Sequence, residues 1–239
     1  KTNVNLRGME TAIKEFGSSL KRGGVGLFYY AGHGLQVAGI NYLVPTGAKI
    51  HSESDVKYET IDAGRVLDEM ENAGNGLNIV ILDACRDNPF GRRFRDMTRG
   101  LAVFNSAPAG TYICYSTGPG QVALDGEGRN SPYAAALLQH MMTPGLNIEQ
   151  VFKRVRLSLG KVTDGKQIPW TLSSLQGEFY FTPGEAPADV PAAPMSTERE
   201  QPKAPADTAK RKAAVDLPAS FTDPATGIEF ILVRGGCFQ

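Results

Sequence analysis

The chain has 239 residues, of which 41% are hydrophobic and 21% are charged, so it can form a packed core and is not wholly disordered. Lysine plus arginine and aspartate plus glutamate each total 25, and this zero formal charge gives no reason to expect a nucleic-acid partner. No apolar run reaches the ~18 residues of a membrane-spanning helix, so we expect no membrane partner either. The wide spacing of Cys85, Cys114 and Cys237 excludes a disulfide scaffold and a paired-cysteine metal site.

Apolar periodicity predicts alternating helices and strands along the first three quarters of the chain. Residues 5–20 repeat apolar side chains at helical spacing and end in a glycine stop. Residues 25–31 are continuously apolar, as in a strand of a sheet covered on both faces. Further segments predict strands at 41–45, 77–83, 111–116 and 178–182, and helices at 62–73, 131–142 and 148–159. This order predicts an α/β fold, a mostly parallel sheet with helices on both faces.

Composition divides the chain into three parts. Residues 1–183 carry the alternating elements and are predicted to form one domain. Residues 184–218 contain nine alanines, six prolines and no aromatic residue, which is typical of a semi-extended linker. Residues 219–239 become apolar again, and we interpret 227–239 as the opening strand of a truncated second domain.

Two candidate catalytic side chains directly follow the two most apolar strands. His33 stands between glycines after 25–31, and Cys85 follows 77–83 among polar residues that can stabilise a thiolate. Functional groups in open parallel sheets lie at the carboxyl ends of strands. If the two strands are neighbours, the imidazole can take the thiol proton and the thiolate can attack a carbonyl. The backbone N–H groups of Gly34 and Cys85 could then bind the developing oxyanion.

The remaining cysteines and histidines have simpler interpretations. Cys114 lies within an apolar strand and is expected in the core, while Cys237 lies outside the first domain. His51 falls in a polar loop and His140 late in an apolar helix. Phosphate-ester hydrolysis on a Cys-x5-Arg loop is disfavoured because Arg92 comes one position too late after Cys85.

The residues around both strand ends resemble a known family. Tyr-Tyr-Ala-Gly-His-Gly at 29–34 and Leu-Asp-Ala-Cys-Arg at 82–86 are similar to motifs of the caspase-like cysteine peptidases, in particular the bacterial metacaspases called orthocaspases. Fifty-two positions separate His33 from Cys85, close to the roughly fifty typical of caspases. Further support comes from 39–45, 100–102, 107–111, 115–120 and 125–126. The resemblance covers about residues 5–182 and implies a caspase-haemoglobinase-like sheet, with His33 as general base and Cys85 as nucleophile.

The resemblance also implies a substrate preference. Caspases carry Gln-Ala-Cys, whereas this chain has Asp83 two positions before Cys85. In metacaspases that acid lies in the primary specificity pocket and pairs with arginine or lysine of the substrate. Asp125 matches a second acidic position of the pocket, and Ser116 is expected to contact substrate as well. We therefore expect protein or peptide substrates cleaved after a basic residue. The alternative is a catalytically inactive caspase-like module that only assembles partners.

Several further expectations follow from the resemblance. The family's first strand and helix should precede residue 1, so this segment is expected either as a separate, cleaved chain that acts as a partner or as a part of the same protein outside this sequence. Basic residues after the cysteine form a candidate self-cleavage segment: Arg92, Arg93, Arg95 and Arg99. No metal or cofactor is expected for the chemistry. Some metacaspases need Ca²⁺ for activation, but no EF-hand-like ligand run occurs here. Residues 227–239 resemble the first strand of formylglycine-generating-enzyme and sulfatase-modifying domains.

Overall fold

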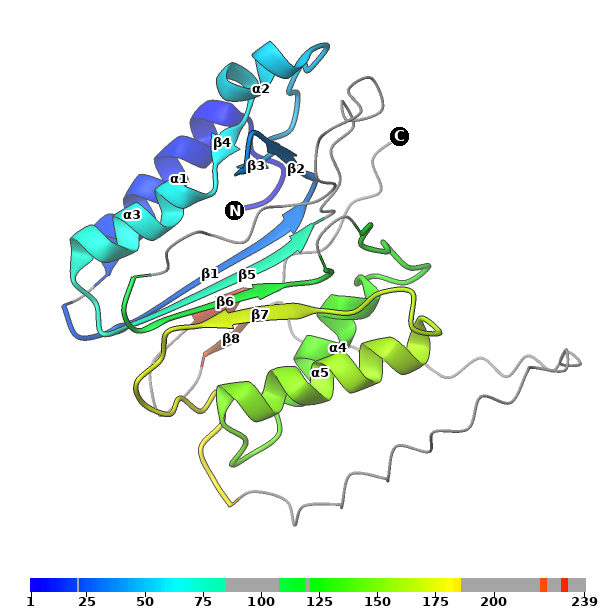
Figure 1. Ribbon diagram of the computed structural model, residues 1–239. Coiled ribbons are helices and arrows are strands. Elements are labelled where there is room, and N and C mark those ends of the chain that lie inside the picture. Colours follow the sequence, from blue (N-terminus) through cyan, green and yellow to red (C-terminus); the bar gives the residue numbers. More distant parts are fainter. Residues whose placement is uncertain (21, 85–107, 119–120, 186–219, 223–228, 232–239) are drawn as a thin grey trace, which may run out of the picture.

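The computed structural model describes residues 1–20, 22–84, 108–118, 121–185, 220–222 and 229–231. Its centre is a four-stranded sheet in the order β1-β5-β6-β7 (Figure 1). The strands are β1 (Val25–Gly32), β5 (Leu77–Ala84), β6 (Thr111–Tyr115) and β7 (Trp170–Ser173). The pairs β1–β5 and β5–β6 are parallel, and β7 is antiparallel to β6. The predicted α/β fold with a mostly parallel sheet is therefore confirmed.

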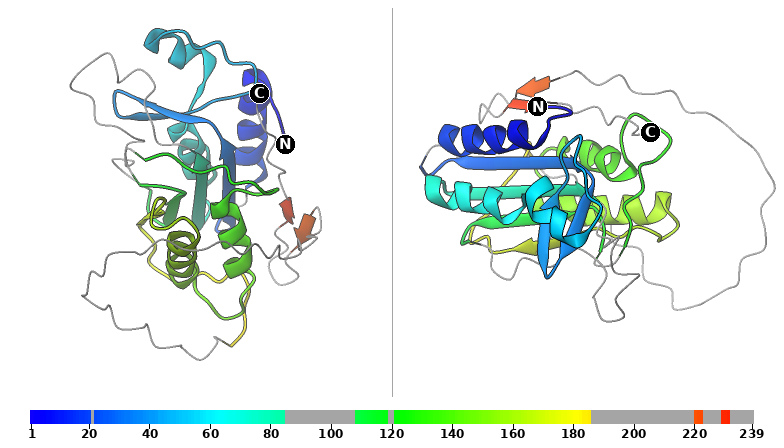
Figure 2. Two further views of the ribbon diagram at one scale, coloured as in Figure 1. Left: turned by 90° about the vertical axis from the view of Figure 1, so that its right-hand side faces the viewer. Right: turned by 90° about the horizontal axis from the view of Figure 1, so that it is seen from above.

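Helices cover both faces of this sheet. One face packs against α1 (Leu6–Ser19) and α3 (Gly64–Ala73), and the other against α4 (Pro132–Met141) and α5 (Ile148–Val162). Figure 2 shows the two helical layers on opposite sides of the strands. The continuous apolar sequence of β1 and β5 is explained by this arrangement, because side chains on both faces are covered.

The central strands alternate between two hydrophobic cores. In β5, Ile79 and Ile81 pack with α4 and α5, whereas Val80 and Leu82 pack with α1 and α3. The same alternation in β6 places Cys114 in the α4–α5 core, fully buried. Because strand side chains alternate with a period of two, a shift by one residue would exchange the cores, so the register of these strands is strongly determined.

Local capping groups set the helix ends. The Asn5 side chain accepts a hydrogen bond from Gly8 N at the start of α1, and Asn147 with Gln150 forms a capping box at the start of α5. Ser131 caps α4, with Pro132 at its first turn. Gly74 ends α3 in the left-handed conformation, at φ 64°, which glycine adopts without strain.

A second, three-stranded sheet lies at the carboxyl end of β1 (Figure 1). It contains β2 (Gly34–Val37), β3 (Ile40–Leu43) and β4 (Ile61–Asp62), and α2 (Glu53–Glu59) precedes β4. The sequence predicts only a strand near β3. A two-residue turn with positive φ at Ala38 and Gly39 joins β2 to β3, as in tight hairpins. The chain therefore reverses at Ala38 and Gly39, one short strand after His33, in a run too short for periodicity to reveal.

The prediction of a final strand at 178–182 is wrong. The strand that completes the sheet is β7, which has only four residues and directly follows a proline. The aromatic alternation at 178–182 places Phe179 and Phe181 in the core, but the backbone there pairs with the α4–α5 connection. Gly145 N donates to Thr182 O at 2.9 Å, and Ile148 N donates to Phe179 O at 2.7 Å. The apolar pattern of 178–182 thus indicates burial correctly, but the backbone of this segment pairs with the α4–α5 connection and not with the central sheet.

Near the carboxyl end the structure has an antiparallel hairpin of β8 (Ser220–Thr222) and β9 (Glu229–Ile231). Of these two strands, only β9 lies within 227–239, where the sequence predicts a strand, and β8 precedes that range. Residues 186–219, which hold most of the expected linker, lie outside the described residues, and the three-part division remains a prediction.

Truncating a side chain at the centre of the sheet should destabilise the fold. Ile113 in β6 is fully buried, and Ile113→Ala should lower the free energy of unfolding by about 2–5 kcal/mol through lost burial and a cavity. Ile40→Ala, at a position 40% exposed, should change it by less than about 0.5 kcal/mol. Urea unfolding measures both, and equal losses would contradict the assignment of the core.

Candidate active site

The two strands that precede the candidate catalytic residues are direct neighbours. In the parallel β1–β5 pair, Gly32 lies opposite Ala84. His33 directly follows β1 and Cys85 directly follows β5, and His33 is exposed. Cys85 itself lies outside the described residues, so its side chain has no assigned position. The register nevertheless meets the condition on which a cysteine–histidine pair depends, that both strands end side by side at the same edge.

Backbone anchors hold the turn that carries His33. The His33 carbonyl accepts hydrogen bonds from the Tyr30 hydroxyl at 2.7 Å and from Val44 N at 3.0 Å. A Cβ atom at position 32 would lie 2.8 Å from the Tyr30 hydroxyl, which explains the glycine there. Gly34 begins β2 opposite Leu43. The turn is thus fixed by its backbone, and it leaves the His33 side chain exposed.

Asp83, the second-last residue of β5, is a buried carboxylate surrounded by hydroxyl groups. It is only 7% exposed. Its Oδ2 accepts hydrogen bonds from the Ser131 hydroxyl at 2.5 Å and from the Tyr29 hydroxyl at 3.3 Å. Ser116, buried directly after β6, donates its hydroxyl to Ala84 O at 3.5 Å, next to Asp83, and its side chain lowers the pKa of Asp83. Strands β1, β5 and β6 and helix α4 therefore meet at this one side chain.

The surroundings of Asp83 disfavour its ionised form. Burial raises the pKa of Asp83, the hydrogen bonds from Ser131, Ser116 and Tyr29 lower it, and the charge of Asp125 raises it, with a net upward shift. Burial, followed by the charge of Asp83, raises the pKa of Tyr29 well above its ordinary value. No lysine or arginine lies within ion-pair distance of Asp83 among the described residues. A cationic ligand would relieve this unfavourable charge.

Asp125 is exposed in the segment between β6 and α4, and a buried glutamine holds that segment. Gln167 is fully buried after α5. Its side-chain amide donates to Ser116 O at 2.9 Å, and its side-chain oxygen accepts from Leu124 N at 3.0 Å. Gln167 thereby connects the strand end that carries Ser116 to the loop that carries Asp125. Sequence reasoning missed this residue, because an isolated glutamine in a loop gives no signal.

The other histidines and the buried cysteine lie apart from this edge. His51 N donates to Asp55 near the start of α2, and His140 hydrogen-bonds to Ser158 between α4 and α5 at 2.7 Å. Burial lowers the pKa of His140. Cys114 is fully buried, as the sequence predicts, and burial raises the pKa of its thiol, so it remains protonated and inert.

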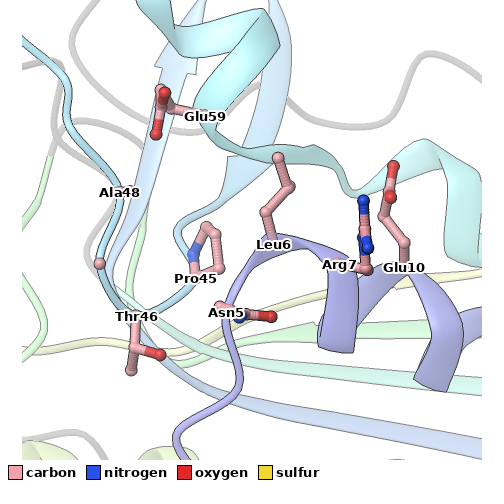
Figure 3. A pocket seen from close by; sticks show the side chains of 9 residues that line it. Asn5, Leu6, Arg7, Glu10, Pro45, Thr46, Ala48 and Glu59 are labelled. Carbon is pink, nitrogen blue, oxygen red and sulfur yellow. The ribbon is translucent and has the colours of Figure 1, made fainter.

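A hollow of about 380 Å³ lies elsewhere, where the start of α1 meets residues 45–48 and Glu59 (Figure 3). Its acidic side chains already have partners. Glu59 accepts from Lys49 N at 3.0 Å, and Glu10 pairs with Arg65 at 3.2 Å. The hollow has no histidine or cysteine in its lining and therefore offers no peptidase chemistry.

The described residues contain no group of three or more histidine, cysteine, aspartate or glutamate side chains placed to hold a metal ion. Nor does any helix in these same ranges have the length and apolar character needed to cross a membrane.

A parallel α/β sheet with histidine and cysteine directly after neighbouring strands is typical of a class of cysteine peptidases. Comparison with known families identifies the class more closely. The model of the caspase domain, peptidase family C14, matches residues 1–180, and the chain belongs to this family. Protein substrates are the expected targets of such a family.

Two curated relatives share part of the sequence. The chain is 29% identical over 178 residues to human mucosa-associated lymphoid tissue lymphoma translocation protein 1, a match that covers 73% of this chain and 21% of the relative. It is 36% identical over 78 residues to the mouse homologue, which covers 33% of this chain and 9% of the relative. The chain thus spans about a fifth or less of these relatives.

Replacing Asp83 with asparagine should stabilise the unliganded protein at neutral and higher pH. The pKa of Asp83 is higher in the folded protein than in the unfolded chain. The folded protein therefore loses stability as the pH rises from the unfolded-state pKa through the folded-state pKa. Asp83→Asn removes that loss, so its Tm should exceed that of the wild type at pH 8, and the difference should shrink toward pH 4.

The matched control is Asp68→Asn, at an exposed position of α3. Thermal unfolding at pH 4, 6 and 8 measures both variants. An Asp83→Asn protein that is less stable than wild type by the same amount at every pH would contradict the account of this carboxylate.

Proposed function

We propose that the chain is a cysteine endopeptidase that cleaves after arginine or lysine, with Cys85 as nucleophile and His33 as general base. The observation that carries the proposal is the register in which Gly32 lies opposite Ala84, since it brings the two following residues to one edge of the sheet. Membership of the caspase-domain family supports it, because peptide hydrolysis is the chemistry for which that family is named.

In the proposed reaction His33 takes the proton of the Cys85 thiol, and the thiolate attacks the carbonyl carbon of the scissile peptide. The N–H groups of Gly34 and Cys85 stabilise the oxyanion of the tetrahedral intermediate. The intermediate collapses to a thioester as the protonated His33 gives its proton to the leaving amine. His33 then takes a proton from water, whose oxygen attacks the thioester, and the products are a carboxylate and the free thiol.

The preference for a basic residue rests on Asp83, with Asp125 as a second acid and Ser116 beside them. A guanidinium or ammonium group that enters this pocket meets a buried carboxylate, and a charge-assisted hydrogen bond there is stronger than one in water. The substrate cation supplies the partner that Asp83 lacks among the described residues. The proposed chemistry requires no metal or other cofactor, and Ca²⁺ would act only as an activator.

Short fluorogenic peptides that end in arginine, lysine or aspartate test the function directly. Wild type should hydrolyse the arginine and lysine peptides and leave the aspartate peptide intact, with or without Ca²⁺. Cys85→Ala and His33→Ala should abolish turnover, whereas His51→Ala, a control far from the site, should retain it. Asp83→Asn should lower kcat/KM for the arginine peptide by roughly 10²-fold or more, because the pocket loses its charge.

Turnover of the aspartate peptide would refute the pocket assignment while leaving the nucleophile in place. No turnover of any peptide by demonstrably folded protein would favour the inactive partner-binding module.

We also propose that the peptidase cleaves its own chain after one or more of Arg92, Arg93, Arg95 and Arg99, which lie outside the described residues. Incubated wild-type protein should give fragments whose new N-termini follow these arginines, and Cys85→Ala protein should stay intact. N-terminal sequencing measures both, and identical fragments from the two proteins would show that another protease makes the cuts.

A further inference from the structure

The hydroxyl group of Ser131 contacts two groups that belong to different parts of the fold. It accepts a hydrogen bond from Ala134 N at 2.9 Å, as the cap of α4, and it donates one to Asp83 Oδ2 at 2.5 Å. Ala134 is three residues from Ser131 along the chain, whereas Asp83 is 48 residues away. The cap is a common local device, but the second bond joins the start of α4 directly to the acid of the specificity pocket.

From this geometry we propose that Ser131 is a positioning residue of the specificity pocket, which orients Asp83 and keeps it as an anion ready to receive a basic side chain. The inference deepens the proposed function and, as a statement about substrate binding, rests on it.

Two physical effects and a comparison of distances support this role of Ser131. The backbone N–H that donates to Ser131 Oγ polarises the hydroxyl and strengthens its own donation to the carboxylate. The start of a helix carries partial positive charge, which favours an anion beside it. The Ser131 bond is also the shorter of the two measured on Oδ2, since the Tyr29 hydroxyl lies 3.3 Å away.

Several groups from the packed elements face Asp83 besides Ser131. Tyr29 comes from β1, Ser116 from the end of β6, and Asp125 from the loop before α4. Burial raises the pKa of Tyr133 in α4, and the charge of Asp83 adds to this shift. Among the effects that lower the pKa of Asp83, the hydrogen bond from Ser131 is the largest, and removal of this bond should therefore raise it.

A set of substitutions separates capping of α4 from donation to Asp83. Ser131→Ala loses both functions. Ser131→Asp keeps a capping oxygen but cannot donate and adds a second negative charge, whereas Ser131→Thr keeps both functions. Asn5→Ala removes the cap of α1, which touches no pocket residue, and is the matched control for the loss of a cap.

Two readouts are made on each variant in a Cys85→Ala background. The first is binding of agmatine, a guanidinium probe, by calorimetry, and the second is titration of the Asp83 side chain by carbon NMR. Ser131→Ala should weaken agmatine binding about ten- to hundredfold and move the Asp83 titration to higher pH. Ser131→Asp should do at least as much, and Ser131→Thr and Asn5→Ala should stay within about twofold of the parent.

An unchanged Asp83 titration and unchanged agmatine affinity in Ser131→Ala and Ser131→Asp would overturn the inference and leave Ser131 as a helix cap only. If the parent protein fails to bind agmatine while the Asp83 titration still moves in Ser131→Ala, the basic-residue pocket fails and the control of Asp83 by Ser131 stands. Together the two readouts distinguish failure of the proposed basic-residue pocket from failure of the proposed role of Ser131.

Discussion

The parallel pairing of β1 with β5 is the constraint on which the site depends. Gly32 lies opposite Ala84 in this pair. His33 and Cys85, which are more than fifty positions apart in the sequence, therefore each follow a strand that ends at the same edge of the sheet. This register is enforced by the cores on both faces of the sheet, since a slip by one residue would exchange the buried sets of β5. The packing that stabilises the fold thus also determines which strand ends lie side by side at the carboxyl edge of the sheet.

Asp83 is the main point where stability and the proposed substrate binding oppose each other. A buried carboxylate costs stability when no cation accompanies it, and none does so among the described residues; the raised pKa of Asp83 expresses that cost. The surrounding structure reduces the cost with neutral donors from Tyr29, Ser116 and Ser131. Hydroxyl groups can orient the carboxylate without neutralising it, so its charge remains for a ligand. This combination is typical of a recognition site rather than of a structural ion pair.

Much of the fold could be predicted from sequence because long apolar runs and helical periodicity report burial, as in β1, β5 and α5. The pattern failed where burial and pairing diverge. Phe179 and Phe181 are buried, but their segment pairs with the α4–α5 connection, and β7 is too short to be recognised. For the site, motifs indicated Asp83 and His33, since local spacing carries them. Ser131 and Gln167 act across 48 and 51 residues, a relation that no local pattern contains.

The central claim is that Cys85 attacks a carbonyl held in place by a basic side chain in the Asp83 pocket. Reaction with matched peptidyl chloromethyl ketones that end in arginine or aspartate tests it most directly, with intact mass and peptide mapping as the readout. The account predicts one adduct, on Cys85, from the arginine reagent, and none from the aspartate reagent. Labelling of a different residue, or equal labelling of Cys85 by both reagents, would contradict it.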